Sequence, residues 1–203
     1  MNLELSFFLI MMTLYLVHDF SLTQYFKRKF KKEDNFLGEK APSELQKFFG
    51  KAFYLVIVYY ALILLYLLTG FNFWGLISNI TLIDSTNVKI LGFALGIIFL
   101  TFMTLARLNL GSSWRVGLDY NSKDELRTTG FYEYIRNPYF AFLLGFQFAV
   151  IVVSPNAITI FALIQSYLLL NLQVREEESF LEEKYGEKYV MYKTRVGRFV
   201  PKI

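Results

Sequence analysis

The chain contains no cysteine and a single histidine, His18. The missing cysteines exclude disulfides, thiolate metal ligands and a cysteine nucleophile, and one histidine is too few for a histidine-rich metal centre. The sequence also lacks a P-loop, a dinucleotide-binding glycine fingerprint and any run of metal ligands. We therefore predict that the protein holds no metal.

The chain is unusually rich in apolar residues. It is 203 residues long, with 55% hydrophobic and 19% aromatic residues, and its mean hydropathy is +0.38. An α-helix needs about 20 apolar residues to cross the hydrocarbon core of a membrane. Five apolar blocks approach this length: Leu3–Phe20, Ala52–Gly70, Val88–Leu108, Tyr139–Val153 and Ala157–Val174. We predict an all-α integral membrane protein with about five transmembrane helices, the fourth of them short.

The basic residues orient these helices. Eight Lys or Arg residues lie between Lys27 and Lys51, whereas Gly70–Asn87 contains none. By the positive-inside rule the first loop is cytosolic, so the loop Arg107–Asn137 and the C-terminal tail are cytosolic as well. The basic loop suits anionic lipid headgroups, and we expect no nucleic-acid partner. The first span lacks the positive start of a signal peptide, so we expect a retained anchor.

A polar, aromatic segment that we call the motif loop, Leu126–Tyr139, stands between two apolar blocks. Asn137 suits an N-cap whose side chain accepts from backbone N–H groups, and Pro138 suits the first helical position. With Arg136 beside it, this helix start could hold an anion. The alternative is a capped helix preceded by interfacial aromatic residues.

The tail after the last span is the second informative segment. Its apolar positions recur at three- to four-residue steps, which predicts that the helix continues out of the membrane as an amphipathic helix; these positions are Val174, Leu181, Tyr185, Tyr189 and Tyr192. Arg175, Glu177 and Glu178 lie at the membrane exit, where an ionisable group needs a partner or a function. An ordinary solvated helix face is the alternative.

Three other features favour structural roles. We expect His18-Asp19 to be an interfacial polar pair, and the spacing of Gly92 and Gly96 predicts close helix packing. Trp114-Arg115 is typical of an interfacial anchor, although its proximity to the motif loop leaves substrate contact open.

The motif loop and the tail together resemble the superfamily of isoprenylcysteine carboxyl methyltransferases and phospholipid methyltransferases. The resemblance runs from Ser112 to Pro201, so we divide the chain into N-terminal helices, 1–111, and a catalytic region, 112–203. Two positions depart from the family pattern, because Asn137 and Asp124 stand where histidine is common. The pattern consists of Leu126, Gly130, Tyr132, Arg136-Asn137-Pro138, Tyr139, Gly145, Glu177-Glu178, Leu181, Tyr185-Gly186, Tyr189, Tyr192 and Pro201.

The resemblance implies S-adenosylmethionine as cofactor, with S-adenosylhomocysteine as product. The cofactor-binding residues that it implies are Leu126, Arg127, Gly130, Tyr132, Asn137, Pro138, Tyr139 and Glu177. The candidate catalytic residues are Arg136, Arg175 as the cation facing the substrate, and Glu178 as a base for an acceptor that carries a proton. Gln173 is the alternative to Arg175 on the substrate side.

We expect the methyl acceptor to be a carboxylate, thiol or amine of a lipidic or small hydrophobic molecule. The chain resembles prokaryotic members, which places it in the inner membrane with its site facing the cytosol. Two other functions stay open: an NADPH-dependent enzyme like the sterol reductases, and a non-catalytic membrane scaffold.

Overall fold

The computed structural model describes residues 2–31, 44–72, 75, 77–81, 83–115, 117 and 124–202. Within these residues the chain forms helices and no β-strand, which confirms the all-α prediction. The α-helices are α1 (Leu3–Phe30), α2 (Glu44–Thr69), α3 (Thr86–Leu110), α4 (Pro138–Val153), α5 (Ala157–Tyr185) and α6 (Glu187–Arg195). Two short 3₁₀ helices, η2 (Gly111–Ser113) and η3 (Gly130–Glu133), flank the loop before α4.

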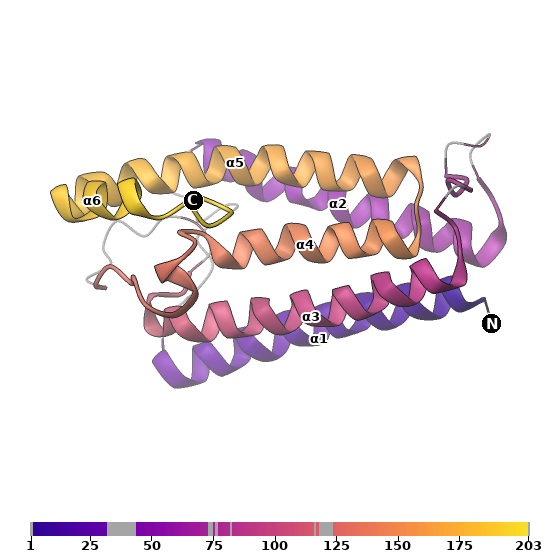
Figure 1. Cartoon of the computed structure of the whole chain (residues 1–203), viewed down its shortest axis with the longest axis horizontal. Coiled ribbons are helices and arrows are strands. Elements are labelled where there is room, and N and C mark those ends of the chain that lie inside the picture. Colours follow the sequence, from indigo (N-terminus) through magenta and orange to yellow (C-terminus); the bar gives the residue numbers. More distant parts are fainter. Residues whose placement is uncertain are drawn as a thin grey trace.

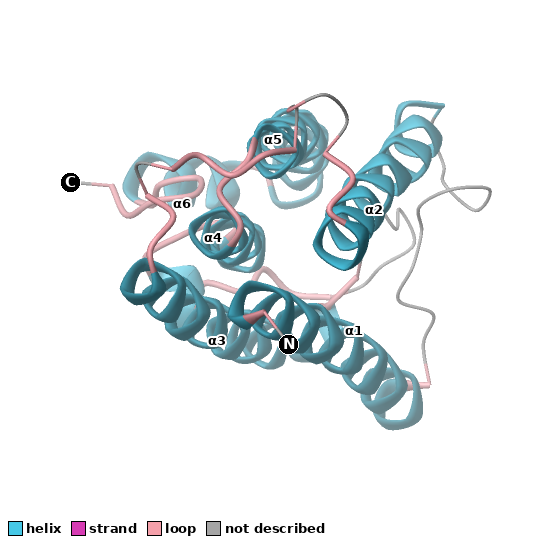
Figure 2. Cartoon of the chain, turned by 90° about the vertical axis from the view of Figure 1, so that its right-hand side faces the viewer, coloured by secondary structure: helices cyan, strands magenta, loops and turns pink. Residues whose placement is uncertain are grey.

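The five long helices lie nearly side by side along the long axis of the molecule (Figure 1). In the end-on view α1 and α3 form one side, α2 and α5 the other, and α4 lies between them (Figure 2). The packing of α3 against α4 is the most extensive in the bundle. Successive helices run in opposite directions, so the motif loop and the end of α5 meet at one end.

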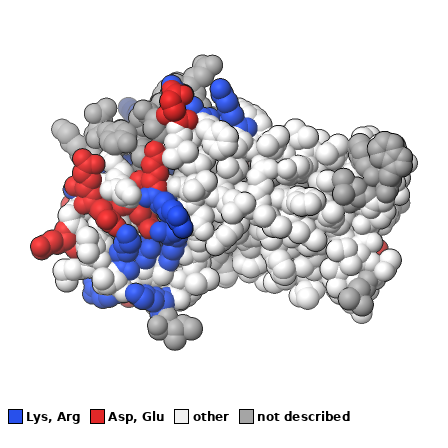
Figure 3. Space-filling view, turned by 90° about the horizontal axis from the view of Figure 1, so that it is seen from above, with Lys and Arg blue, Asp and Glu red and all other residues white. Residues whose placement is uncertain are grey.

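Among the described residues, four helices are long and apolar enough to cross a membrane: α1, α2, α3 and α5. The fourth predicted span, α4, is apolar but has only 16 residues. At 1.5 Å per residue it covers about 24 Å, less than the roughly 30 Å hydrocarbon core. Charged side chains gather at the end of the molecule that carries α6, and the rest of the surface in this view is almost free of them (Figure 3).

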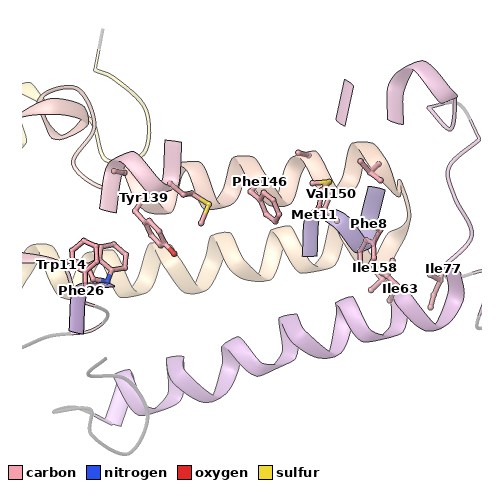
Figure 4. Close-up of a cluster of buried hydrophobic side chains, with 14 residues drawn as sticks. Phe8, Met11, Phe26, Ile63, Ile77, Trp114, Tyr139, Phe146, Val150 and Ile158 are labelled. Carbon is pink, nitrogen blue, oxygen red and sulfur yellow. The ribbon is translucent and has the colours of Figure 1, made fainter. Parts of the chain in front are cut away.

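A buried apolar cluster, which we call the core cluster, extends along the bundle from Trp114 and Phe26 at one end to Ile77 at the other (Figure 4). Gly92 and Gly96 allow its helices to approach closely. A Cβ added at Gly92 would lie 2.9 Å from Val152 Cγ1, and one at Gly96 would lie 2.4 Å from Met11 Cε.

The tail differs from the single amphipathic helix that the sequence predicts. Helix α5 does continue past the apolar stretch, but it ends at Tyr185. Gly186 then adopts a backbone φ of +56°, a value that residues other than glycine rarely adopt. Helix α6 starts at the next residue, Glu187. Because the backbone breaks at this glycine, α6 turns away from the axis of α5 and packs beside it (Figure 1).

Candidate functional site

A pocket lies at the charged end of the bundle, between the end of α3, the motif loop and the α5–α6 tail. Its position is that expected from the opposite directions of the helices. The lining residues are Leu110, Ser113, Trp114, Arg115, Asp124, Glu125, Leu126, Arg127, Tyr132, Arg136, Asn137, Tyr139, Phe140, Glu177, Leu181, Tyr185, Tyr189 and Tyr192. This set joins residues more than 60 positions apart in the sequence, which only the folded chain brings together.

The pocket separates two apolar clusters. Its membrane-side wall consists of Leu110, Trp114, Tyr139 and Phe140, all of which belong to the core cluster or pack against it. The opposite wall belongs to a second cluster, the tail cluster, made of Tyr189, Tyr192 and Val196 with Leu126, Leu181 and Tyr185 packed against them. The pocket therefore has one face toward the membrane interior and one toward the tail.

Tyrosine hydroxyl groups tie the motif loop to the tail. The hydroxyl of Tyr192 donates to the backbone oxygen of Tyr132, and that of Tyr185 donates to the backbone oxygen of Asp124. Burial raises the pKa of Tyr132 well above its usual value, with a further contribution from the charge of Glu177. Tyr132 is consequently a neutral phenol that offers an aromatic face and a polar tip.

Glu177 is the acidic side chain of the pocket that belongs to α5. It lies outside the apolar span, three residues after Val174, and the described residues offer its carboxylate no hydrogen bond or ion pair. Burial raises the pKa of Glu177 to about 7, and although Arg115 opposes this shift, Glu178 adds to it. A half-buried carboxylate of this kind, partly removed from water, favours a cationic or hydrogen-bond-donating ligand.

Arg115 lies on another side of the same pocket, although sequence reasoning gave it only an anchoring role with substrate contact left open. Its Nη1 atom is 3.2 Å from Asp124 Oδ2, so the pocket contains an ion pair as well as the carboxylate of Glu177. The sequence gave no stronger signal, because an arginine beside an interfacial tryptophan is ordinary in membrane proteins.

Arg136 and Glu178 form an ion pair beneath the pocket. Nε and Nη2 of Arg136 donate to Glu178 Oε1 over 2.9 and 2.7 Å, and Arg136 Nη1 donates to the backbone oxygens of Lys193 and Val196. Arg198 Nη2 donates to Glu178 Oε2 over 2.6 Å. The side chains of Arg136 and Glu178 are only 8% and 3% exposed, so this network joins the motif loop, α5 and the C-terminus away from solvent.

The two arginines also decide the charge state of Glu178. Burial alone would raise the pKa of Glu178, but hydrogen bonds and charge from Arg198 and Arg136 outweigh it, and the pKa is lowered. Glu177 and Glu178 are adjacent in sequence, yet their pKa values move in opposite directions because only Glu178 has guanidinium partners. The structure thus gives Glu178 the properties of an ionised anchor.

Residues Val196–Pro201, which we call the strap, were not among the predicted site residues. Arg136 N donates to Gly197 O over 2.8 Å, and Asn137 N donates to Arg198 O over 3.1 Å. These bonds place the strap alongside the motif loop in an isolated parallel bridge between Ile135 and Gly197. The strap has no sequence periodicity, so the partners of Arg198 could not be inferred from the sequence.

The strap also changes the role of Asn137, which the sequence predicts to cap α4 through its side chain. Asn137 does occupy the N-cap of α4 and Pro138 the first helical position, but the Asn137 side chain makes no capping hydrogen bond. Its Nδ2 atom donates to Arg198 O over 3.4 Å. The cap prediction was therefore wrong for the side chain, because the strap engages the amide that would otherwise accept from the helix.

Gly197 allows a test of the strap. A Cβ at this position would lie 1.9 Å from the backbone oxygen of Val200, a contact that the strap can relieve only by moving. We expect Gly197→Ala to lower the midpoint of thermal unfolding in detergent by several degrees, whereas Gly186→Ala meets no atom within 4 Å and is strained only by its φ. Equal midpoints for Gly197→Ala and wild type would contradict a packed strap.

The predicted site residues, including those described above, fall into two groups. Those that line the pocket are Leu126, Arg127, Tyr132, Arg136, Asn137, Tyr139 and Glu177. Those that do not line it are Gly130, Pro138, Arg175, Gln173 and Glu178. Arg175 is exposed, whereas Gln173 is 3% exposed and its Oε1 atom is buried without a hydrogen-bond partner among the described residues. Of the two substrate-side alternatives, the buried one is therefore Gln173.

Comparison with known proteins adds a family to this geometry. Residues 88–188 match a family model described as phospholipid methyltransferase, and curated proteins gave no match. The matched region covers α3 from its third residue, all of α4 and all of α5, so it begins earlier than the resemblance noted from Ser112 and ends before the strap. With its membrane-spanning helices and a pocket between the motif loop and the tail, the chain belongs to the superfamily of integral membrane methyltransferases that includes the isoprenylcysteine carboxyl methyltransferases and the phospholipid methyltransferases.

Proposed function

We propose that the protein transfers a methyl group from S-adenosylmethionine to a lipidic or small hydrophobic acceptor. The observation that supports this best is Glu177, a half-buried carboxylate without a hydrogen-bond or ion-pair partner among the described residues, in a pocket lined with tyrosines. S-adenosylmethionine is a sulfonium cation that also carries an ammonium group and ribose hydroxyls. Its cationic and donor groups match such a carboxylate.

The chemistry of the pocket residues fits this cofactor. Glu177 would accept a hydrogen bond from it, the faces of Tyr132 and Tyr139 would stabilise positive charge by cation–π attraction of ~0.5–2 kcal/mol, and Leu126 would contact its apolar parts. Arg127 and Arg115 supply positive charge for its carboxylate. Tyr132 and Tyr139 are only 7% and 9% exposed, so these two walls of the pocket are themselves shielded from water.

When bound, the cofactor supplies an activated methyl group. In an in-line displacement the bond from sulfur to the methyl carbon breaks, its electron pair stays on sulfur, and the acceptor nucleophile forms the new bond to carbon. Alignment at about 3–3.5 Å and exclusion of water are then the main tasks of the protein. A carboxylate acceptor needs no base, whereas an amine or thiol must give a proton to solvent or a protein group. The ionised Glu178, held by two arginines, is poorly suited to accept it.

An NADPH-dependent reductase is the second candidate enzyme. Its cofactor carries a pyrophosphate and a further phosphate, which need several cations or free backbone donors. Among the described residues the cations that line this pocket are Arg115, Arg127 and Arg136, and two of them already bind carboxylates. Titration of the detergent-purified protein with S-adenosylmethionine and, separately, NADPH distinguishes the two enzymes, and binding of neither would favour a scaffold.

We further propose that the pocket faces the cytosol. Thr81 lies in the loop before α3, and Glu187 starts α6 at the opposite end; both residues are exposed. Because the chain has no native cysteine, we expect Thr81→Cys to react with an impermeant thiol reagent in intact cells, and Glu187→Cys only after lysis. The reverse pattern would separate the pocket from cytosolic cofactor. Lys40, in the basic loop used to predict this topology, lies outside the described residues.

A further inference from the structure

A buried arginine lies directly behind the membrane-side wall of the pocket. Arg107, in the last turn of α3, is 1% exposed. Its Nη1 atom is 3.2 Å from Asp19 Oδ1, and its Nη2 atom donates to Thr23 Oγ1 over 2.8 Å. Both partners belong to α1, so Asp19 contacts α3 and is more than a polar residue at the end of a span. A charged group so close to the hydrocarbon core is costly, and such residues usually serve a function.

The guanidinium of Arg107 also contacts the pocket wall. Its Cζ atom lies 4.5 Å from the centre of the Trp114 ring and 5.3 Å from that of Phe26. Trp114 in turn meets Tyr139 edge to face, with 4.5 Å between the ring centres. Figure 4 shows Trp114 and Phe26 together at the end of the core cluster that is nearest Tyr139. A continuous series of contacts therefore runs from Asp19 through Arg107 and Trp114 to Tyr139.

Trp114 depends on this stack for its orientation. The residue is 8% exposed, and its Nε1 atom is buried without a hydrogen-bond partner among the described residues. Within the described part of the chain, no hydrogen bond therefore fixes the rotation of the indole. Its ring contacts are the guanidinium of Arg107 over one face and the edge contact with Tyr139, and a desolvated cation–π contact is strong enough to hold the orientation.

The two walls of the pocket differ in what they can meet. The Glu177 side carries the tail tyrosines and faces the charged end, whereas Trp114 and Tyr139 belong to the core cluster inside the bundle. A hydrophobic acceptor that entered between helices would meet the pocket from this apolar side. The ring of Trp114 would then be the surface against which the acceptor is aligned with the methyl group.

We infer that Arg107, held by Asp19 and Thr23, is a positioning residue that fixes Trp114 as the acceptor-side wall of the methyl-transfer site. This inference rests on the proposed function. It gives α1 and α3, for which the sequence indicated no functional residue, a part in acceptor alignment. Arg107 acts through Trp114 and does not itself line the pocket.

The test distinguishes an effect on the acceptor side of the pocket from an effect on the cofactor side. For full-length protein in detergent, we would measure the dissociation constant of S-adenosylmethionine, and transfer of its radiolabelled methyl group into lipid extracted from native membranes. We expect Arg107→Met to lower transfer by at least about tenfold while the dissociation constant stays within about twofold. Arg107→Lys should recover only part of the activity, because an ammonium cannot form the flat stack. Arg28→Met, which removes an exposed arginine from α1, should change neither quantity.

A spectroscopic measurement keeps the test decisive if Arg107→Met folds poorly. In a Trp74→Phe background Trp114 is the remaining tryptophan of the two in the chain, and we expect Asp19→Asn to shift its emission to longer wavelength and to lower transfer in the same direction as Arg107→Met. The inference is overturned if transfer and cofactor affinity fall together, if neither changes, or if Trp114 emission is unaffected. It also fails if wild type binds the cofactor but labels no lipid. Wild type that binds no S-adenosylmethionine would refute the proposed function itself.

Discussion

Glu177→Gln is expected to weaken S-adenosylmethionine binding by about tenfold to more than a hundredfold. The substitution keeps the size of the side chain but removes its charge, and a hydrogen bond to a charged group contributes about 1.5–3 kcal/mol. The carboxylate of Glu177 is available to bind a ligand because the described residues offer it no ion pair. Glu178 beside it, by contrast, is paired with two arginines. Calorimetric titration of the detergent-purified protein measures the change.

The raised pKa of Glu177 gives this prediction a pH dependence with a defined sign. A carboxyl group with a pKa of about 7 is mostly protonated at lower pH and ionised at higher pH. Because the cationic cofactor prefers the ionised form, we expect affinity to rise about tenfold from about pH 6 to about pH 8, with most of the change around pH 7. In Glu177→Gln the rise should disappear, which leaves only the titration of the cofactor's own groups.

Glu183→Gln is the matched control, since Glu183 is an exposed glutamate on the same helix and does not line the pocket. It should bind the cofactor as wild type does at every pH. If Glu177→Gln instead retained wild-type affinity and the same pH profile, the cofactor would have to bind elsewhere and the site assignment would be wrong.

Arg136→Ala is expected to destabilise the protein by about 3–5 kcal/mol, because it leaves Glu178 buried with a single remaining partner. At the size of this chain, such a loss lowers the unfolding midpoint by roughly 10 °C. Arg136→Lys should rescue little, since one ammonium cannot replace both the two-pronged contact of Nε and Nη2 with Glu178 Oε1 and the contacts of Nη1 with two backbone oxygens. Thermal unfolding in detergent measures both variants.

The exposed Arg195 in the last turn of α6 provides the control. Arg195→Ala should change stability by no more than about 0.5 kcal/mol. Arg136→Ala could instead keep wild-type stability and lose methyl transfer. That result would contradict the anchoring role that the network indicates. It would support the direct catalytic role that the sequence predicts for Arg136.

The sequence alone was sufficient for the environment, the five apolar helices and the family, but not for the break at Gly186 that separates α5 from α6. Apolar blocks and their lengths predict membrane helices because the hydrocarbon core sets how many residues a span needs, and this requirement is local in sequence. The short α4, the start of α4 at Pro138 and the continuation of α5 beyond Val174 all follow from such local patterns. Leu126, Tyr132 and Glu177 could be named as candidates because the resemblance of the motif loop and the tail to the superfamily implies them.

Only the tertiary structure decided what each charged residue touches. Glu178 meets Arg136 across 42 positions of sequence and Arg198 across 20, and Arg107 reaches Asp19 across 88. Periodicity tells which face of a helix a side chain occupies, but not which other helix that face contacts. The neighbouring residues Glu177 and Glu178 have the same side chain, yet the pKa of Glu177 is raised and that of Glu178 is lowered. The difference arises because two arginines that are distant in sequence bind Glu178, whereas Glu177 faces the pocket.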